Sequence, residues 1–362
     1  DDDDDDDDDD EFVARRDAAA SLASKAGLEV VAQLLAGTTT EIVLDAGSIA
    51  SCPMTLQQAR KVARPIAEAL AKTKTLLTLI LRGPWNNSAK NSTSRNRSTL
   101  HDSIFKARNT VLQQILKEGL KRNTSVTTLV IRSNKSLDRY AGRIFGDLFR
   151  THSKLARLEL QNCSWGNVQH SSGWNCLLLG LQHSKSIKSI SLEGTGLSAS
   201  DLDGISLTIK HLELVSVRLV GVNLHTIDDP ESLVLFFRTV QETTSIRELE
   251  LSRNLLGGGG HPLRLLCKSL SGDSVELYRD RNRNQLTSSE MMNAEDPDED
   301  DEDDEIQHHI EKLTLVDCGI SRTSDVKMLT RALTTDDLRD NPIALSVLEV
   351  SGNQFGNAGA KV

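Results

Sequence analysis

Leucine and other aliphatic residues recur along the chain in one spacing, L-x-x-L-x-L-x-x-N/C-x-L, in which x is mostly polar. Clear copies begin at Leu155, Ile246, Ile310 and Leu345. Two apolar positions separated by one residue are typical of a strand with one buried face. A unit of this kind is one strand plus a helical return and cannot bury its own apolar face. We therefore expect the units to stack and share one core.

Nine copies of the pattern can be aligned by their second apolar position. These markers are Ile42, Leu79, Leu129, Leu158, Ile190, Leu212, Leu249, Leu313 and Leu348. They are separated by 37, 50, 29, 32, 22, 37, 64 and 35 residues, so the gap of 29 is a plain repeat and the longer gaps contain insertions. We predict a polar loop insertion at residues 83–109 and an acidic, disordered insertion at residues 287–306. The longest gap also leaves room for a degenerate tenth unit near Val275.

Between the predicted strands the apolar residues change to helical spacing. Examples are the apolar faces within residues 111–120, 144–149, 233–240 and 326–333. Short turns rich in Asn, Ser and Thr follow these segments, and such side chains end helices by bonding to the local backbone. The predicted fold is an α/β solenoid, a horseshoe with a concave parallel sheet and convex helices.

Residues 348–360, which read Leu-Glu-Val-Ser-Gly-Asn-Gln-Phe-Gly-Asn-Ala-Gly-Ala, resemble the strand-to-helix unit of ribonuclease-inhibitor-type leucine-rich repeats. This class includes the repeat domains of NOD-like receptors and of the Ran GTPase-activating protein. The resemblance covers roughly residues 28–362 and implies a concave sheet that docks other proteins. We expect one repeat domain at residues 12–362, with nine or ten units. Gly27–Gly37 reads as the helix of a preceding unit, so we expect a fragment of a longer array.

The net charge of −10 conceals two acidic segments on a basic body. Residues 1–11 contain 11 acidic groups and residues 295–305 contain 10. The remaining 31 acidic and 42 basic residues leave the body at about +11 by this count. Dense blocks of like charge repel themselves, so we predict that residues 1–11 are disordered and that the internal run is a solubilising linker. Docking on the basic body and recruitment of a basic partner are the alternatives for the internal run.

Five cysteines without paired spacing do not form a disulfide framework. Cys163 and Cys318 occupy a slot of the repeat that other units fill with Asn134, Asn254 and Asn353. We expect these five residues to form a structural ladder that hydrogen-bonds the backbone of the turn. Reduced thiols, the absence of an apolar run of about 20 residues and an acidic N-terminus favour a cytoplasmic protein that does not enter membranes, with the nucleus as an alternative.

Charged residues recur on the predicted concave face, where alternate side chains of each strand point outward. The early strands carry Arg82, Arg132 and Arg157, and the later ones carry Glu159, Glu193, Glu213, Glu248, Glu250 and Glu349. We expect Glu213 and Glu250 to face one another as like charges on neighbouring strands. A basic protein surface would relieve such an acidic stripe, and an ordinary solvated surface is the alternative.

No chemistry of catalysis or of cofactor binding can be assembled from the sequence. Gly257–Gly260 lacks the G-K-[ST] of a phosphate loop. Cys163, His170, Cys176 and His183 miss the tight spacing of a zinc site. The sequence also gives no set of nucleophile, general base and orienting group. We therefore expect no metal, no cofactor and no enzymatic activity.

The main prediction is therefore a scaffold that binds a protein partner on its concave face. A regulator of a small GTPase is the first alternative, with Arg82 or Arg132 as the arginine that would stimulate hydrolysis. The second alternative is nucleic-acid binding through the basic region at residues 82–122, since Lys and Arg can neutralise phosphates. That region has only Trp85 for base stacking and no recognised nucleic-acid motif, so an ordinary basic surface is favoured over it.

Overall fold

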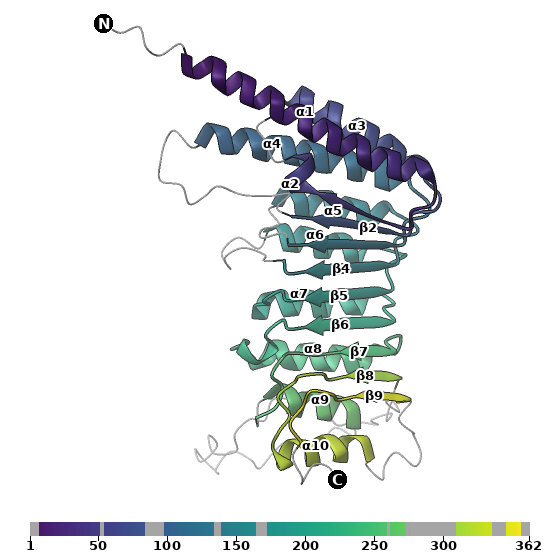
Figure 1. Cartoon of the computed structure of the whole chain (residues 1–362). Helices are drawn as coiled ribbons and strands as arrows, with labels where there is room; N and C mark the ends of the chain where they lie inside the picture. Colours follow the sequence, from purple (N-terminus) through teal and green to yellow (C-terminus); the bar gives the residue numbers. More distant parts are fainter. Residues whose placement is uncertain are drawn as a thin grey trace, which may run out of the picture.

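The computed structural model of the chain describes residues 7–50, 54–83, 98–133, 139–163, 172–258, 261–272, 275, 309–334 and 345–355. Its central feature is one open, all-parallel sheet of nine strands in sequential order (Figure 1). The strands are β1 Glu41–Asp45, β2 Thr78–Arg82, β3 Thr128–Arg132, β4 Arg157–Gln161, β5 Ser189–Glu193, β6 Ser216–Val220, β7 Glu248–Glu250, β8 Lys312–Thr314 and β9 Val347–Glu349. Each strand pairs only with its neighbours in sequence, which defines a solenoid of strand–helix units.

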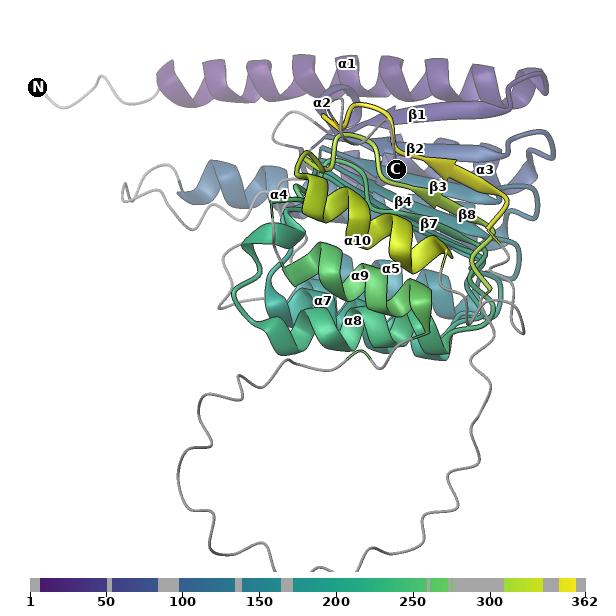
Figure 2. The same cartoon turned by 90° about the horizontal axis from the view of Figure 1, so that it is seen from below.

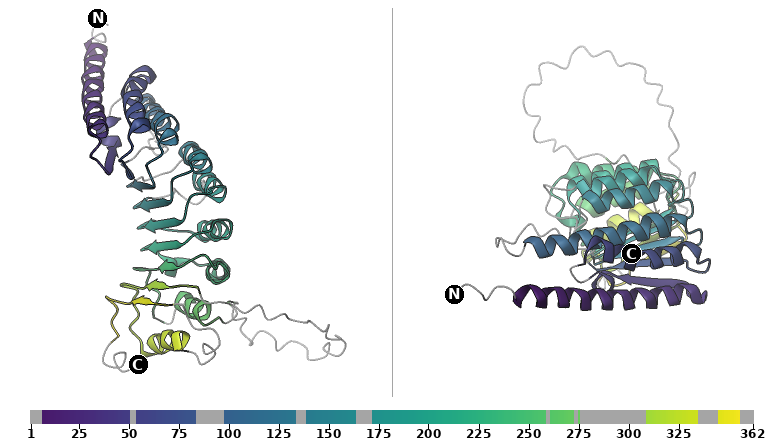
Figure 3. Two further views of the ribbon diagram at one scale, coloured as in Figure 1. Left: turned by 90° about the vertical axis from the view of Figure 1, so that its right-hand side faces the viewer. Right: turned by 90° about the horizontal axis from the view of Figure 1, so that it is seen from above.

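Apart from α1, which precedes β1, the helices follow strands and cover one face of the sheet (Figure 3). The helices are α1 Asp7–Ala36, α2 Ala46–Ile49, α3 Leu56–Lys72, α4 Ser98–Gln114, α5 Arg139–Thr151, α6 Ser172–Gln182, α7 Ala199–His211, α8 Pro230–Glu242, α9 His261–Ser271 and α10 Thr323–Thr334. A π-helix η2 Ile115–Gly119 and a 3₁₀ turn η3 Leu120–Arg122 continue α4, and a 3₁₀ turn η5 Leu224–Thr226 follows β6. Helix α1 lies at the β1 end of the array beside α3 (Figure 2).

The core lies between the sheet and the helices. In β2, β3 and β4 the marker leucines Leu79, Leu129 and Leu158 are fully buried, as are apolar residues of α4 and α5 such as Leu112 and Phe145. Strand residues that alternate with the markers point away from the helices. One continuous apolar layer therefore runs through the units, as the repeated spacing predicts.

The sixth strand differs from its predicted position. The sequence marker was Leu212, but this residue ends α7 as its C-cap, and β6 has Val217 at the marker position. Leu214, which is fully buried, fills the first apolar position of the unit. The gaps around this strand become 27 and 32 residues in place of 22 and 37. Leu212 and Leu214 have the spacing of two buried residues in a strand. In the structure, Leu212 is the C-cap of α7 and Leu214 is the first apolar residue of the next unit.

Helix α1 contains the predicted helical segment but buries other residues than expected. The spacing of Leu28, Val31, Leu34 and Leu35 predicts one apolar face. Of these, Leu34 is buried, whereas Leu28 and Leu35 are 59% and 63% exposed. The buried face instead includes Ala23 and Val30. Gly27 also lies on this face, where its α carbon approaches α3.

The predicted insertions lie partly outside the described residues. Of the polar insertion at 83–109, residues 98–109 belong to α4, so this part is a helix and not a loop. The buried Ala107 shows why, because it continues the apolar face of the helix toward Val111. The acidic insertion at 287–306 lies outside the described residues, as do residues 1–6, whereas residues 7–11 form the first turns of α1.

Candidate functional site

We call the face of the sheet that points away from the helices the sheet face. It carries alternate residues of the nine strands, and the parallel register aligns them in rows across the sheet. One row holds Val43, Ile80, Val130, Glu159, Ser191, Arg218, Glu250, Thr314 and Glu349. Apolar side chains therefore occupy the row in the first three strands, and polar or charged ones occupy it from β4 onward.

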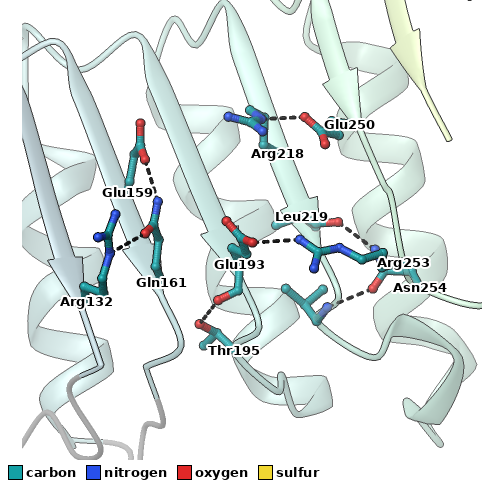
Figure 4. A network of polar contacts seen from close by, with 11 residues as sticks. Arg132, Glu159, Gln161, Glu193, Thr195, Arg218, Leu219, Glu250, Arg253 and Asn254 are labelled. Carbon is teal, nitrogen blue, oxygen red and sulfur yellow. Dashed lines mark hydrogen bonds and ion pairs between the residues drawn. The ribbon is translucent and has the colours of Figure 1, made fainter. Parts of the chain in front are cut away.

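Three of the glutamates predicted to form an acidic stripe are paired with arginines of the same chain. Figure 4 shows the pairs of Glu193 and Glu250. Glu159 Oε1 lies 2.7 Å from Arg157 Nε, and Glu193 Oε1 lies 2.7 Å from Arg253 Nη2. Glu250 Oε2 accepts a hydrogen bond from Arg218 Nε at 2.5 Å. The middle of the sheet face is thus a set of internal ion pairs and not an uncompensated negative surface.

Arg218 was not among the predicted site residues, and its position follows from the corrected place of β6. It lies directly opposite Glu250 on the neighbouring strand, where Glu213 was expected. Burial lowers the pKa of Arg218, but the hydrogen bond of Glu250 and the charges of Glu250, Glu159 and Glu193 together raise it above its usual value. The spacing Leu214-x-x-Val217-x-Leu219 was the sequence signal that would have identified it.

Glu213 lies outside the sheet face, so the predicted repulsion between Glu213 and Glu250 is wrong. It precedes β6 in an exposed turn, and its side chain is 86% exposed. Lys188 Nζ donates to Glu213 Oε2 at 2.8 Å, and this bond lowers the pKa of the carboxyl. The pair adds little to stability, because exposed ion pairs are screened by solvent and lose side-chain entropy.

Glu248 and Glu349 are the two exposed carboxylates of the predicted set that lie on the sheet face toward its β9 end. Glu248 lies beside Lys312 of the next strand. Glu349 accepts a weak hydrogen bond from Ser351 Oγ at 3.4 Å. These two side chains are the part of the predicted stripe that stays open to a partner.

The arginines of the early strands are arranged differently from the later ones. Arg82 and Arg132 lie opposite one another on β2 and β3. Arg132 Nε donates to Gln161 Oε1 at 2.8 Å, and Gln161 Nε2 donates to Glu159 Oε2 at 3.0 Å. Neither Arg82 nor Arg132 forms an ion pair with a described residue, whereas Arg157 pairs with Glu159.

A hollow of about 370 Å³ lies on the sheet face over β1 to β4. Its lining includes the two unpaired arginines and three aliphatic side chains, among other residues: Glu41, Val43, Thr78, Ile80, Arg82, Thr128, Val130, Arg132, Arg157 and Glu159. Ile80 and Val130 are only 4% exposed although they point away from the core. The hollow thus combines a shielded apolar floor with a charged rim.

The ladder residues bond to the backbone between adjacent units. Asn254 is fully buried; its Nδ2 donates to the carbonyl of Leu219 at 2.6 Å, and its Oδ1 accepts from Val222 N at 2.9 Å. Asn353 repeats this geometry with the carbonyl of Leu315 and the amide of Cys318.

Two cysteines take part in the same ladder through their thiols. Cys163 Sγ donates to the carbonyl of Ile131 at 3.3 Å and Cys318 Sγ to that of Leu251 at 3.2 Å. Burial raises the pKa of Cys318 to about 11, so the thiol stays protonated and able to donate at neutral pH. Asn134 lies outside the described residues.

A second polar ladder, which the sequence reading did not single out as such, lies at the other end of the strands. Asn123, His152 and Ser184 are buried three positions before the first apolar residue of their units. Asn123 Oδ1 accepts from Val126 N at 2.7 Å, and His152 Nδ1 accepts from Leu155 N at 3.0 Å. The two ladders fix both ends of the strands and hold the sheet-face side chains in register.

Two kinds of feature are absent from the described ranges. There, no three His, Cys, Asp or Glu side chains gather as metal ligands would. No helix within them combines the length and the apolar character that a membrane crossing requires. Comparison with known protein families gives no match, and comparison with curated proteins gives none.

Proposed function

We propose that this chain is a leucine-rich-repeat solenoid of the ribonuclease-inhibitor type that acts as a non-enzymatic scaffold and binds a protein partner on its sheet face. The observation that carries this proposal is the hollow over β1 to β4, on a face that no described element covers. The repeat spacing and the Asn/Cys ladder support the assignment to this class of repeats. Buried, free cysteines among the described residues support an intracellular location.

Neighbouring side chains fix the orientation of charged groups on the sheet face, and this order favours the binding of a partner. Gln161 orients Arg132, and ion pairs fix Arg157 and Arg218. Side chains that are ordered before association lose less conformational entropy when a partner binds. The ion pairs also remove the main argument for a basic partner, because Glu159, Glu193 and Glu250 are already neutralised. A basic partner stays a prediction that rests on Glu248 and Glu349.

The test is affinity capture from the source's lysate with two charge-reversal variants of matched net change. The sheet-face variant combines Arg82→Glu, Glu248→Lys and Glu349→Lys, all exposed positions. The helix-side control combines Glu29→Lys, Asp147→Lys and Lys327→Glu, which are also exposed. We expect partners that bind the wild type and the control to be lost from the sheet-face variant. An identical set of captured proteins for all three would refute sheet-face binding.

Regulation of a small GTPase is a second candidate, favoured by one observation. Arg82 and Arg132 lie on the sheet face with no carboxylate partner among the described residues, and an arginine supplied by a regulator can stabilise the transition state of GTP hydrolysis. The measurement is GTP hydrolysis by a panel of small GTPases, with Arg82→Ala and Arg132→Ala as controls. No acceleration by the wild type would remove this candidate.

Nucleic-acid binding by residues 82–122 gains no specific support. Arg82 lies on the sheet face, whereas Lys117 and Lys121 line a separate surface with residues of α5 on the helix side. Arg108 Nε is used internally, since it donates to the carbonyl of Ala50 at 2.9 Å. These cations therefore do not form one stripe along which a phosphate backbone could run.

A further inference from the structure

The hollow over β1 to β4 differs from the rest of the sheet face in the composition of its floor. Val43, Ile80 and Val130 form adjacent positions of one row, and the next residue of that row is Glu159. Ile80 and Val130 are almost fully shielded, so the floor of the hollow offers few polar groups to a ligand. Ionic hydrogen bonds above such a floor are stronger than they would be in bulk water.

Two guanidinium groups lie at the rim of this hollow, and neither forms an ion pair with a described carboxylate. Arg82 and Arg132 are opposite one another on strands about 4.8 Å apart, so two like charges extend from neighbouring positions of one row. The nearest acidic side chain in their row is Asp45, opposite Arg82. Its Oδ1 accepts from Gly47 N at 2.7 Å as the N-cap of α2. An anion between the two arginines would relieve their repulsion.

The geometry of Arg132 is fixed by a chain of contacts. Arg132 Nε donates to Gln161, Gln161 donates to Glu159, and Glu159 pairs with Arg157. Since Nε is occupied by Gln161, the terminal nitrogens are left as donors toward the hollow. Such a fork matches the two oxygens of a carboxylate.

We propose that this hollow binds an extended acidic segment of the protein partner, with one carboxylate between Arg82 and Arg132 and an adjacent aliphatic side chain over Val43, Ile80 and Val130. This inference rests on the proposed function and names the chemistry of the partner. A peptide carboxylate is favoured over a nucleic-acid phosphate for two reasons. The lining has no aromatic ring on which a base could stack, and its two arginines without an ion-pair partner among the described residues match one carboxylate rather than the successive phosphates of a backbone.

The binding test uses fluorescein-labelled eight-residue peptides on a Gly/Ser background and measures fluorescence anisotropy with the full chain. The central pair is Glu-Leu in the probe, Gln-Leu in the neutral control and Lys-Leu in the reversed control, with a twelve-nucleotide uridine RNA as the probe for phosphates. We expect Glu-Leu to bind at least tenfold more tightly than Gln-Leu, because hydrogen bonds to a charged acceptor are stronger than those to a neutral one. Equal affinity for Glu-Leu and Gln-Leu, or tighter binding of the RNA than of any peptide, would overturn the proposal.

The arginines are tested by Arg82→Gln and Arg132→Gln, with Arg150→Gln as a control on the exposed helix side. Each sheet-face substitution should weaken Glu-Leu binding about tenfold, and the control should leave it unchanged. Arg132→Lys keeps the charge but loses the fork, so it should recover only part of the affinity. Thermal unfolding followed by circular dichroism establishes that the variants are folded, and unaltered affinity in the folded Arg82→Gln/Arg132→Gln variant would overturn the proposal.

The capture experiment separates this inference from the proposed function. If the sheet-face variant loses its partners and the Arg82→Gln/Arg132→Gln variant retains them, the face binds protein but the hollow is not the site. If neither variant loses a partner, both proposals fail. Loss from both variants, together with the peptide preference, supports both.

Discussion

His152 occupies the same place in its unit as Asn123 does in the preceding one, and both residues accept two backbone N–H bonds. His152 Nδ1 accepts from Lys154 and Leu155, and Asn123 Oδ1 accepts from Ser125 and Val126. A histidine can play this part only while Nδ1 carries no proton. The structural role of the ladder therefore becomes dependent on pH at this one unit.

Burial lowers the pKa of His152, opposed by the backbone carbonyls of Leu120 and Asn123. The unfolded chain, with the ordinary value of 6.5, therefore binds the proton more readily than the folded one. It follows that the free energy of unfolding falls as pH drops below about 6.5 and receives no pH-dependent contribution from His152 well above that value.

We expect His152→Asn to reduce this fall, since Asn123 shows that asparagine makes the same bonds. The measurement is urea denaturation of both proteins at pH 5.5, 7.5 and 8.5. Between pH 7.5 and 8.5 the free energy of unfolding should change by the same amount in both proteins, and this comparison is the internal control. An equal loss of stability between pH 7.5 and 5.5 in both proteins would contradict this assignment.

Asn254 carries four backbone bonds in a fully buried position, to the carbonyls of Leu219 and Leu251 and the amides of Val222 and Leu224. Asn254→Ala leaves these groups without a partner and should lower the free energy of unfolding by roughly 3 kcal/mol. Asn254→Cys should cost less, because a thiol at this slot can still donate to a carbonyl, as that of Cys318 does. Urea denaturation at pH 7.5 ranks the variants, and an alanine variant within about 0.5 kcal/mol of the wild type would argue against the ladder.

At the scale of single elements, α5 and α6 approach one another through glycines. A β carbon on Gly180 would lie 2.1 Å from the Gly146 α carbon, and one on Gly146 would lie 2.5 Å from the carbonyl oxygen of Cys176. Backbone atoms cannot move aside as a flexible side chain can. The close contact of these two helices therefore depends on the absence of side chains at both positions.

Gly180→Ala should destabilise the protein by about 1–3 kcal/mol, because the overpacking outweighs the roughly 1 kcal/mol that alanine gains in a helix interior. The control is Gly27→Ala in α1, where the nearest atoms are side-chain carbons of Ile66 and Val62 at 3.5 Å. That variant should be as stable as the wild type or slightly more so. Thermal unfolding of the two variants checks the prediction, and similar effects at both sites would refute it.

The elements also show how far the sequence could predict the structure. Eight of the nine predicted markers lie at the marker position of their strands. They could be predicted because the alternation of apolar and polar residues in a strand can be seen within a few neighbouring residues of the sequence. Leu212 failed because a leucine that closes a helix has the same spacing as one in a strand. The strand β6 lies five residues later than the sequence predicts. As a result, Arg218 and not Glu213 is on the sheet face.

The charge pattern of the site could not be read from the strands alone. Arg253 follows β7 in a left-handed conformation with φ 58°, and from there its side chain reaches Glu193 on β5. No spacing rule connects residues 253 and 193. The ladder, in contrast, repeats at one fixed position of the motif and is accessible to sequence reasoning.

At the scale of the whole molecule, each described strand pairs only with its neighbours in sequence. Strands β4 and β5 have a strand on both sides, and their marker side chains Leu158 and Ile190 are buried. Strand β9 pairs only with β8 in the described part of the chain, and its Val347 and Leu348 are 46% and 42% exposed. In a one-dimensional array, stability follows from the unit and its interfaces, so the ends should open before the middle.

Hydrogen–deuterium exchange followed by mass spectrometry tests this gradient. We expect peptides that cover β4 and β5 to exchange last and those that cover β9 to exchange first, since local opening needs less free energy where fewer apolar contacts are lost.

The same gradient should appear when buried leucines are truncated. Leu158→Ala should lower the free energy of unfolding by about 2–5 kcal/mol in urea denaturation, as truncation of a fully buried leucine does, and Leu348→Ala should lower it by less than about 1 kcal/mol. Equal protection along the sheet would mean that the units unfold as one cooperative body. A single exchange rate and equal costs for the two leucines would together rule out nearest-neighbour coupling as the basis of the array's stability.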